Sequence, residues 1–301
     1  MRSGTVAVVG RANAGKSTLI NVIVGEKVSI VSPKPQTTRD RILAVYNAED
    51  CQIVFQDTPG IYKASSLLNE RMQKTAVRTA DDVDLVLMLV DAHSGLKAED
   101  KELIDSFVKR GEYKMIIALT KTDITADGVI PQVVTEIGEL PKDKVICVTA
   151  ISSRTGKNVK KLIGLLKENL PEGEPIISED IISDKSEKFM IAEIMREKVL
   201  LKYDKEIPHG VAVVVNTFER RESGSYYISL DIVCEKPNHK AIIIGKQGKA
   251  LKETAAFARA GMEKFLGAKV FLEVYVKVKT DWRNRPDRLH EYGYDGDDGI
   301  K

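Results

Sequence analysis

The sequence predicts an α/β doubly wound domain followed by a smaller domain of the α+β class. Up to about residue 170, short β-branched runs alternate with amphipathic helical patterns, which is typical of βαβ units around a mainly parallel sheet. After an acidic stretch that contains Pro and Gly, the order of elements changes to α-β-β-α-β. The length of 301 residues also suits two domains.

The elements of the first domain, residues 1–170, follow from two different periodicities. Apolar runs rich in β-branched residues predict strands at 5–9, 42–46, 52–56, 85–90, 115–120 and 145–149. Apolar residues that recur every three or four positions predict helices at 17–24, 67–80, 99–110, 131–139 and 159–169. Together they describe a sheet with helices packed against it.

Residues 171–185 are the predicted linker. Pro171 and Gly173 end the last helix, because proline cannot continue it and glycine weakens it. The second domain, residues 186–294, is expected to contain a helix at 188–202, strands at 211–219 and 226–235, a helix that begins near 249, and a strand at 270–278. Residues 295–301 are predicted to form an acidic tail.

Composition excludes several classes of protein. Apolar residues make up 43% of the chain and charged residues 30%, which excludes a disordered or collagen-like chain. The longest apolar run, at 85–90, is far shorter than the about 20 residues that span a bilayer, and no signal peptide begins the sequence. A cytoplasmic protein is therefore expected. The three cysteines and four histidines have no metal-ligand spacing, so we expect no zinc site.

A phosphate-binding loop is predicted directly after the first strand. The segment GRANAGKS, residues 10–17, fits G-x-x-x-x-G-K-[ST] between a strand and a helix. Glycines let backbone N–H groups turn toward phosphate oxygens, Lys16 is expected to reach the β- and γ-phosphates, and the Ser17 hydroxyl is expected to bind Mg²⁺. A glycine-rich turn that binds nothing is the alternative. The predicted binding residues are Gly10, Asn13, Ala14, Gly15, Lys16, Ser17 and Thr18.

Two later loops supply the rest of the predicted metal and γ-phosphate site. Asp57 ends an apolar strand, which is expected to deliver its carboxylate to the outer shell of the metal. The N–H of Gly60 is expected to contact the γ-phosphate. Thr38 is the predicted third magnesium residue beside Ser17 and Asp57, with Thr37 its close competitor. Lys16, Thr38 and Gly60 are the predicted catalytic residues.

The segment TKTD, residues 120–123, predicts that the base is guanine. The Asp123 carboxylate can accept hydrogen bonds from the guanine N1–H and 2-amino group, whereas adenine would leave it desolvated and unpaired. The Lys121 stem is expected to cover the base. After the sixth strand, the Ala150 N–H is expected to donate to guanine O6. The predicted base-site residues are Thr120, Lys121, Asp123, Thr149 and Ala150.

A second motif, IGKQGK, predicts RNA binding. A G-x-x-G loop at a helix start lets a sugar-phosphate backbone approach closely. The segment 186–294 also carries 20 basic and 15 acidic residues, a net charge of +5, which suits a phosphate-rich partner. A plain turn is the alternative. The predicted RNA-binding residues are Ile244, Gly245, Lys246, Gln247, Gly248 and Lys249.

With these motifs in place, residues 4–170 resemble a P-loop GTPase of the translation-factor-related class, and the whole chain resembles the Era family, GTPases with a C-terminal type II KH domain. The segments AEIMREK at 192–198 and DWR at 281–283 add to the likeness. The resemblance implies GTP/GDP and Mg²⁺ as ligands, binding near the 3′ end of small-subunit ribosomal RNA rather than DNA, assistance to small ribosomal subunit assembly, and a monomer.

The sequence departs from the relatives at informative positions. Thr120 stands where the family usually has asparagine, and Ala12 and Ala14 replace Pro and Val. Ile61 stands where Ras-like enzymes have a water-orienting glutamine, so slow intrinsic hydrolysis is expected. The competing hypotheses are a GTPase acting in RNA modification and an RNA chaperone with a vestigial nucleotide site. Peripheral contact with the inner face of the membrane through the basic surface stays open as well.

Overall fold

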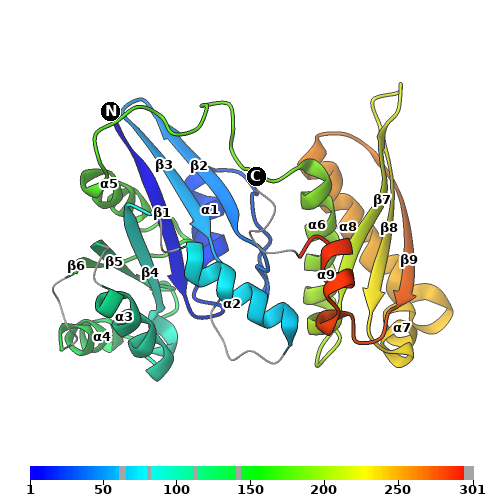
Figure 1. The fold of residues 1–301 in the computed structure, drawn as a ribbon, viewed down its shortest axis with the longest axis horizontal. Coiled ribbons are helices and arrows are strands. Elements are labelled where there is room, and N and C mark those ends of the chain that lie inside the picture. Colours follow the sequence, from blue (N-terminus) through cyan, green and yellow to red (C-terminus); the bar gives the residue numbers. More distant parts are fainter. Residues whose placement is uncertain (61–65, 80–82, 111–113, 140–143, 295–301) are drawn as a thin grey trace. The chain divides into compact units, whose positions relative to one another are not determined.

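The computed structural model describes residues 1–60, 66–79, 83–110, 114–139 and 144–294, which excludes Ile61 and the tail at 295–301. They group into two compact units (Figure 1). The first unit comprises Met1–Ser29, Thr38–Lys63 and Met72–Asp184, and the second comprises Ile30–Thr37, Ala64–Arg71 and Lys185–Lys301. The short segments 30–37 and 64–71 thus belong to the second unit although they precede residue 170.

The first unit is built on a six-stranded sheet whose order is β2-β3-β1-β4-β5-β6. Every neighbouring pair is parallel except β2 and β3, which are antiparallel. The predicted mainly parallel sheet is confirmed. Its strands are β1 (Arg2–Gly10), β2 (Ile42–Ala48), β3 (Cys51–Asp57), β4 (Leu85–Asp91), β5 (Lys114–Thr120) and β6 (Val145–Ala150).

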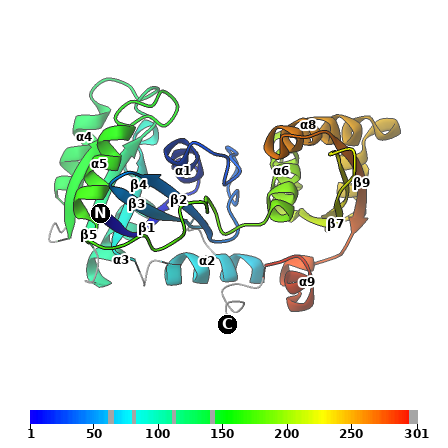
Figure 2. The same ribbon diagram turned by 90° about the horizontal axis from the view of Figure 1, so that it is seen from above.

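Helices cover both faces of this sheet (Figures 1 and 2). Successive side chains of a strand point to opposite faces. In β1, Val6 and Val8 accordingly enter one apolar core with α1 and α5, while Ala7 and Val9 enter another with α3 and α4. The helices are α1 (Lys16–Val24), α2 (Leu67–Thr79), which belongs to this unit from Met72 on, α3 (Ala98–Arg110), α4 (Val129–Gly138) and α5 (Val159–Asn169).

The second unit contains a three-stranded sheet in the order β7-β8-β9. β7 and β8 are antiparallel, and β8 and β9 are parallel. Helices α6 and α8 lie beside the sheet (Figure 1), and their apolar side chains share one core with those of the strands. The predicted α+β class is confirmed. The elements are α6 (Glu187–Lys202), β7 (Ala212–Arg220), β8 (Tyr226–Cys234), α7 (Pro237–Ile244), α8 (Lys249–Leu266), β9 (Val270–Val278) and α9 (Pro286–Glu291).

Two helices of this unit, α7 and α9, were not predicted. Both are short and begin with proline, so neither shows enough turns for a helical period. Within the described residues, no helix combines the length and the apolar character required to cross a bilayer.

Candidate functional site

The glycine-rich loop joins β1 to α1 at the carboxyl edge of the sheet, where β1 lies between β3 and β4. Ligands of open α/β sheets bind at this edge. Gly10 has φ 148°, and a Cβ added there would lie 2.5 Å from the Leu89 carbonyl oxygen. Only glycine fits this position, because a side chain would collide with the backbone of β4.

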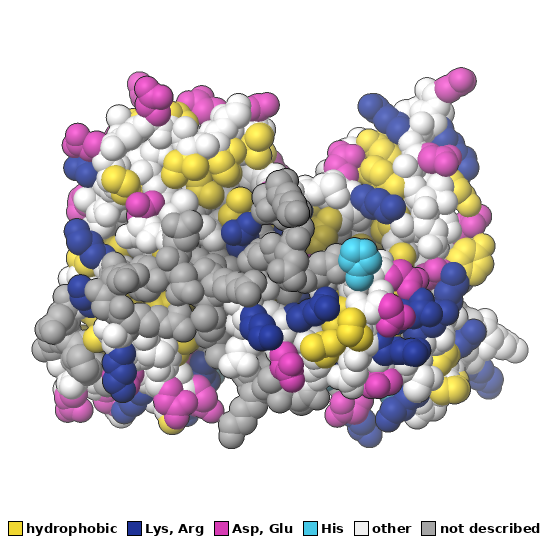
Figure 3. Space-filling view, in the orientation of Figure 1, with side chains coloured by type: hydrophobic (Ala, Val, Ile, Leu, Met, Phe, Trp, Pro, Cys, Tyr) yellow, Lys and Arg dark blue, Asp and Glu magenta, His cyan; other side chains and the backbone are white. Residues whose placement is uncertain are grey.

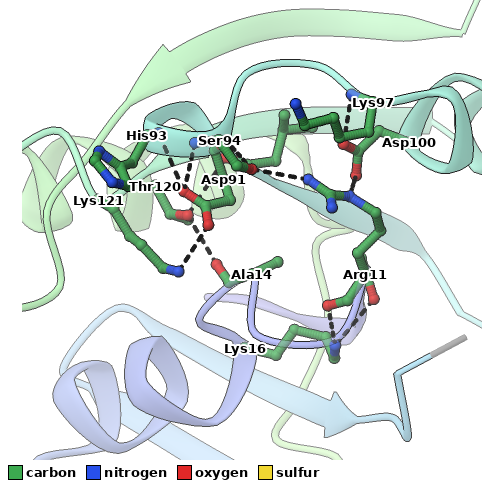
Figure 4. Close-up of polar contacts among 12 residues, drawn as sticks. Arg11, Ala14, Lys16, Asp91, His93, Ser94, Lys97, Asp100, Thr120 and Lys121 are labelled. Carbon is green, nitrogen blue, oxygen red and sulfur yellow. Dashed lines mark hydrogen bonds and ion pairs between the residues drawn. The ribbon is translucent and has the colours of Figure 1, made fainter. Parts of the chain in front are cut away.

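The side chain of Lys16 turns back toward the phosphate-binding loop that precedes this residue. Its side chain is buried, and its Nζ donates to the carbonyl oxygens of Gly10, at 2.9 Å, and Arg11, at 3.0 Å. Figure 4 shows the side chain turned toward these carbonyl groups. Burial lowers the pKa of Lys16 to about 8, and the nearby Asp57 carboxylate opposes this effect.

The lowered pKa of Lys16 predicts pH-dependent nucleotide binding. Below pH 8 the free protein already carries the ammonium charge that phosphate oxygens require. Above pH 8 binding must take up a proton, so affinity is expected to fall by up to about tenfold per pH unit. Calorimetric titration with GDP between roughly pH 7 and 9 checks this, with guanosine as the control because it has the same base without phosphates. Equal pH profiles for the two ligands would contradict the assignment.

Three oxygen-bearing side chains meet beside the loop. The Ser17 hydroxyl donates to Asp57 Oδ2 at 2.8 Å and lies 2.9 Å from the Thr38 hydroxyl. Asp57 is fully buried, and burial raises its pKa against the opposing effect of Lys16. Its other oxygen, Oδ1, has no hydrogen-bond partner among the described residues. A buried carboxylate oxygen that lacks a donor, next to two hydroxyls, suits a hard cation such as Mg²⁺.

The structure distinguishes the two candidate threonines. Thr38 reaches the group around Asp57, whereas the Thr37 hydroxyl donates to the Lys34 carbonyl at 2.6 Å within its own loop. Ser29, which sequence reasoning missed, also donates to Asp57 Oδ2, at 2.9 Å. No motif includes this serine, and a serine that follows an apolar helix gives no separate signal.

Gly60 comes close to the phosphate-binding loop. A Cβ added to Gly60 would lie 3.1 Å from Ala12 Cα and 3.4 Å from Lys16 Nζ. The structure therefore brings together the phosphate-loop residues, Thr38, Asp57 and Gly60, although they come from three separate parts of the chain.

Thr120, at the end of β5, braces the phosphate-binding loop from behind. Its hydroxyl donates to the Ala14 carbonyl at 2.7 Å (Figure 4). The threonine thus retains a link to the loop at the position where asparagine is usual. The next residue, Lys121, forms an ion pair with Asp91 at 2.7 Å, which orients the lysine stem (Figure 4).

The predicted base-binding carboxylate is oriented by a neighbouring loop. The buried Ser152 hydroxyl donates to Asp123 Oδ1 at 2.7 Å. This hydrogen bond is the main cause that lowers the pKa of Asp123, so the carboxylate stays ionised at neutral pH. Asn158 donates from its side chain to the Ala150 carbonyl at 2.7 Å. Ser152 was missed because its contact with Asp123 joins two different loops.

The G-x-x-G loop lies between α7 and α8 of the second unit. Gly245 has φ 71°, and a Cβ added there would lie 2.5 Å from the Cβ of Ala250, so the first glycine is required sterically. Lys246, Gln247 and Lys249 are exposed, and Ile244 is half-buried. Lysine and arginine side chains are visible on the surface of this unit (Figure 3).

Two side chains at the end of α6 and directly after it hold the backbone on either side of this loop. The Tyr203 hydroxyl donates to the Ile243 carbonyl at 2.9 Å, and Lys202 Nζ donates to the Ala250 carbonyl at 2.8 Å. These two carbonyls flank the loop on both sides. The loop therefore presents exposed polar residues from a backbone that Lys202 of α6 and the following Tyr203 keep in place.

Comparison with known proteins finds a matching family for each of the two parts of the chain. A family described as 50S ribosome-binding GTPase matches residues 5–121, and the KH domain family matches residues 206–283. GTPase Era of Clostridium kluyveri is 41% identical, and GTPase Era of Alkaliphilus oremlandii is 44% identical, each over 295 residues that cover 98% of this chain and 99% of the relative.

Two solved structures show the same architecture along almost the whole chain. One is an Era variant of Aquifex aeolicus bound to GDP·AlF4⁻, and the other is Era in complex with MgGDPNP and nucleotides 1506–1542 of 16S ribosomal RNA. Each is 38% identical to this chain, with a TM-score of 0.92, and each match covers 98% of this chain and 99% of the other.

Proposed function

Because this chain belongs to the Era family of GTPases, we propose that it is a slowly hydrolysing GTP switch that binds single-stranded RNA near the 3′ end of small-subunit ribosomal RNA and assists assembly of that subunit. One observation carries the proposal: a single chain combines the Ser17–Thr38–Asp57 cluster with an exposed G-x-x-G loop. A nucleotide site and an RNA site are therefore available in one molecule.

In the nucleotide site, the residues have separate proposed tasks. The loop at 10–17 and Lys16 bind the phosphates, and Gly60 donates its N–H to the γ-phosphate. Ser17, Thr38 and Asp57 would hold Mg²⁺, which neutralises charge on the phosphate oxygens. Hydrogen bonds already join these three side chains, because the hydroxyls of Ser17 and Thr38 lie close to each other and to Asp57 Oδ2.

Base selection is assigned to Asp123 and its neighbours. The Ser152 hydroxyl occupies Asp123 Oδ1, which leaves the remaining lone pairs of the carboxylate for the guanine N1–H and 2-amino donors. Thr120 is committed to the loop carbonyl of Ala14, so its contribution is to the placement of the phosphates rather than to the base.

RNA binding is assigned to the loop residues 244–249. The relative solved with nucleotides of 16S ribosomal RNA supports ribosomal RNA as the partner. The exposed Lys246 and Lys249 supply positive charge, and the N-terminus of α8 supplies backbone N–H groups for phosphate oxygens. Slow hydrolysis is proposed from the sequence alone, because the aliphatic side chain of Ile61 cannot form a hydrogen bond with the attacking water.

The experiment that tests this function measures RNA affinity in two nucleotide states. An oligonucleotide with the sequence of the 3′ end of small-subunit ribosomal RNA is titrated into protein that holds GDPNP or GDP. We expect affinities that differ by about fivefold or more, and single-turnover hydrolysis by the protein alone well below about 1 s⁻¹. A duplex of the same sequence is the control. Equal RNA affinities, with no GTP turnover in the presence of RNA, would instead support the RNA chaperone with a vestigial nucleotide site.

A further inference from the structure

The side chain of Arg11, the second residue of the phosphate-binding loop, is anchored outside that loop. Its Nε lies 2.7 Å from Asp100 Oδ1 of α3, and its Nη2 donates to the Ser94 hydroxyl at 3.0 Å. Figure 4 shows the guanidinium extended toward these two residues, whereas Lys16 lies at the backbone end of the arginine. The charge of Arg11 is therefore committed to α3 and to the short turn Ala92–Ser94 before it.

Asp100 is a buried carboxylate in the first turn of α3. Its side chain is 0% exposed, and its Oδ2 accepts from the N–H of Lys97, which precedes the helix, at 3.1 Å. Burial makes a carboxylate costly unless a cation is paired with it, and Arg11 supplies that cation. The ion pair therefore ties the phosphate-binding loop to the beginning of α3.

The backbone of the same arginine faces the nucleotide site. Its carbonyl oxygen accepts from Lys16 Nζ at 3.0 Å and from the Ala14 N–H at 3.3 Å. Arg11 thus joins α3, through its side chain, to two groups of the phosphate-binding loop, through its carbonyl. All of these residues belong to the first unit, so the connection from Asp100 to Lys16 lies within one compact part of the chain.

We propose that Arg11 is a positioning residue of the phosphate-binding loop: its contacts with Asp100 and Ser94 fix the direction of its carbonyl, which in turn places the Lys16 ammonium and the Ala14 N–H for the phosphates. The inference rests on the proposed binding of a guanine nucleotide and adds what keeps the loop in shape before the nucleotide arrives. A loop that is already ordered loses less conformational freedom on binding, so this anchor raises the affinity for phosphates.

The base end of the site is held by separate contacts. Lys121 pairs with Asp91 Oδ2 at 2.7 Å, and Asp123 Oδ1 accepts from the Ser152 hydroxyl at 2.7 Å. Neither contact includes Arg11. Loss of the anchor should therefore weaken the binding of phosphates and leave the binding of the base alone unchanged, whereas a general loss of folded structure would weaken both.

Two variants test the anchor without leaving a buried charge unpaired. Arg11→Met/Asp100→Asn removes the cation and the carboxylate charge together, and the asparagine oxygen can still accept from the N–H that precedes the helix. Arg11→Lys keeps the positive charge but lacks the planar fork that serves both partners at once. Lys101→Met/Glu136→Gln is the matched control, because it removes an ion pair of 3.2 Å between α3 and α4 by the same change of charge.

For each protein, calorimetry measures the affinity for GDP, saturation-transfer NMR measures the affinity for guanosine, and thermal unfolding measures stability. We expect the affinity for GDP to fall about tenfold or more in Arg11→Met/Asp100→Asn and less in Arg11→Lys, with the affinity for guanosine unchanged in both. Lys101→Met/Glu136→Gln should bind both ligands like the unmodified protein.

An unchanged affinity for GDP, or an equal loss of affinity for guanosine, overturns the positioning role. A lower unfolding temperature with an unchanged ratio of the two affinities overturns it as well, because the ion pair would then serve stability alone. Absence of GDP binding in the unmodified protein would contradict the proposed function, and this inference with it.

Discussion

Replacing Asp123 by asparagine is expected to lower the affinity for GDP and GTP by about 1,000-fold and to shift preference toward xanthine nucleotides. The carboxylate accepts from two donors on guanine, and an amide nitrogen in its place would face those donors. Xanthine has a carbonyl where guanine has the 2-amino group, so it can accept from the new amide. The Ser152 hydrogen bond to Oδ1 should hold the asparagine oxygen on the Ser152 side and direct its amide nitrogen toward the base.

Competition between GDP and xanthosine diphosphate, followed by fluorescence or calorimetry, measures this change. Asp127→Asn is the matched control, since it removes the same charge from an exposed position in the same loop. The control should retain guanine selectivity. Unchanged selectivity in Asp123→Asn would remove Asp123 from the base site and leave the identity of the nucleotide unexplained.

Replacing both Lys246 and Gln247 by aspartate is expected to lower RNA affinity by about 100-fold or more while GDP binding is retained. Both side chains are exposed in the G-x-x-G loop, so the change removes no packing. Gln247 has φ 51°, a conformation that aspartate tolerates better than most residues. The new carboxylates would repel the phosphates that the loop is proposed to bind.

The matched control for this double variant changes charge at the other end of α8. Lys264→Glu/Lys269→Gln alters the net charge by the same −3 at two exposed positions. Lys264 lies roughly 25 Å along the helix from the loop, and Lys269 follows shortly after the helix ends. Filter binding with the 3′-end oligonucleotide then separates an effect of charge at the G-x-x-G loop from an effect of the overall charge of the protein. If both double variants lose RNA affinity equally, binding depends on overall charge and the loop is not the site.

Sequence reasoning recovered the fold class and most elements because their signals are local. The strands of the doubly wound sheet have continuous apolar runs, and α8 has a clear helical period after Gly248. α7 was missed because eight residues with three successive isoleucines show no helical period. Which of Thr37 and Thr38 lies beside Ser17 and Asp57 could not be predicted from the sequence, because it depends on the direction in which each hydroxyl points.

The phosphate loop and the G-x-x-G loop could be predicted from the sequence alone, since each depends on residues close together in the chain, where backbone geometry sets the spacing. The order of these and the other motifs along the chain indicated the family. Only the tertiary structure decided which distant groups meet. Ser29 lies 28 positions from Asp57, and Arg196 lies 159 positions from Thr37, and no spacing encodes such contacts. They form because the packing of the sheet and of α6 brings the groups within hydrogen-bond distance, and burial then requires each polar atom to find a partner.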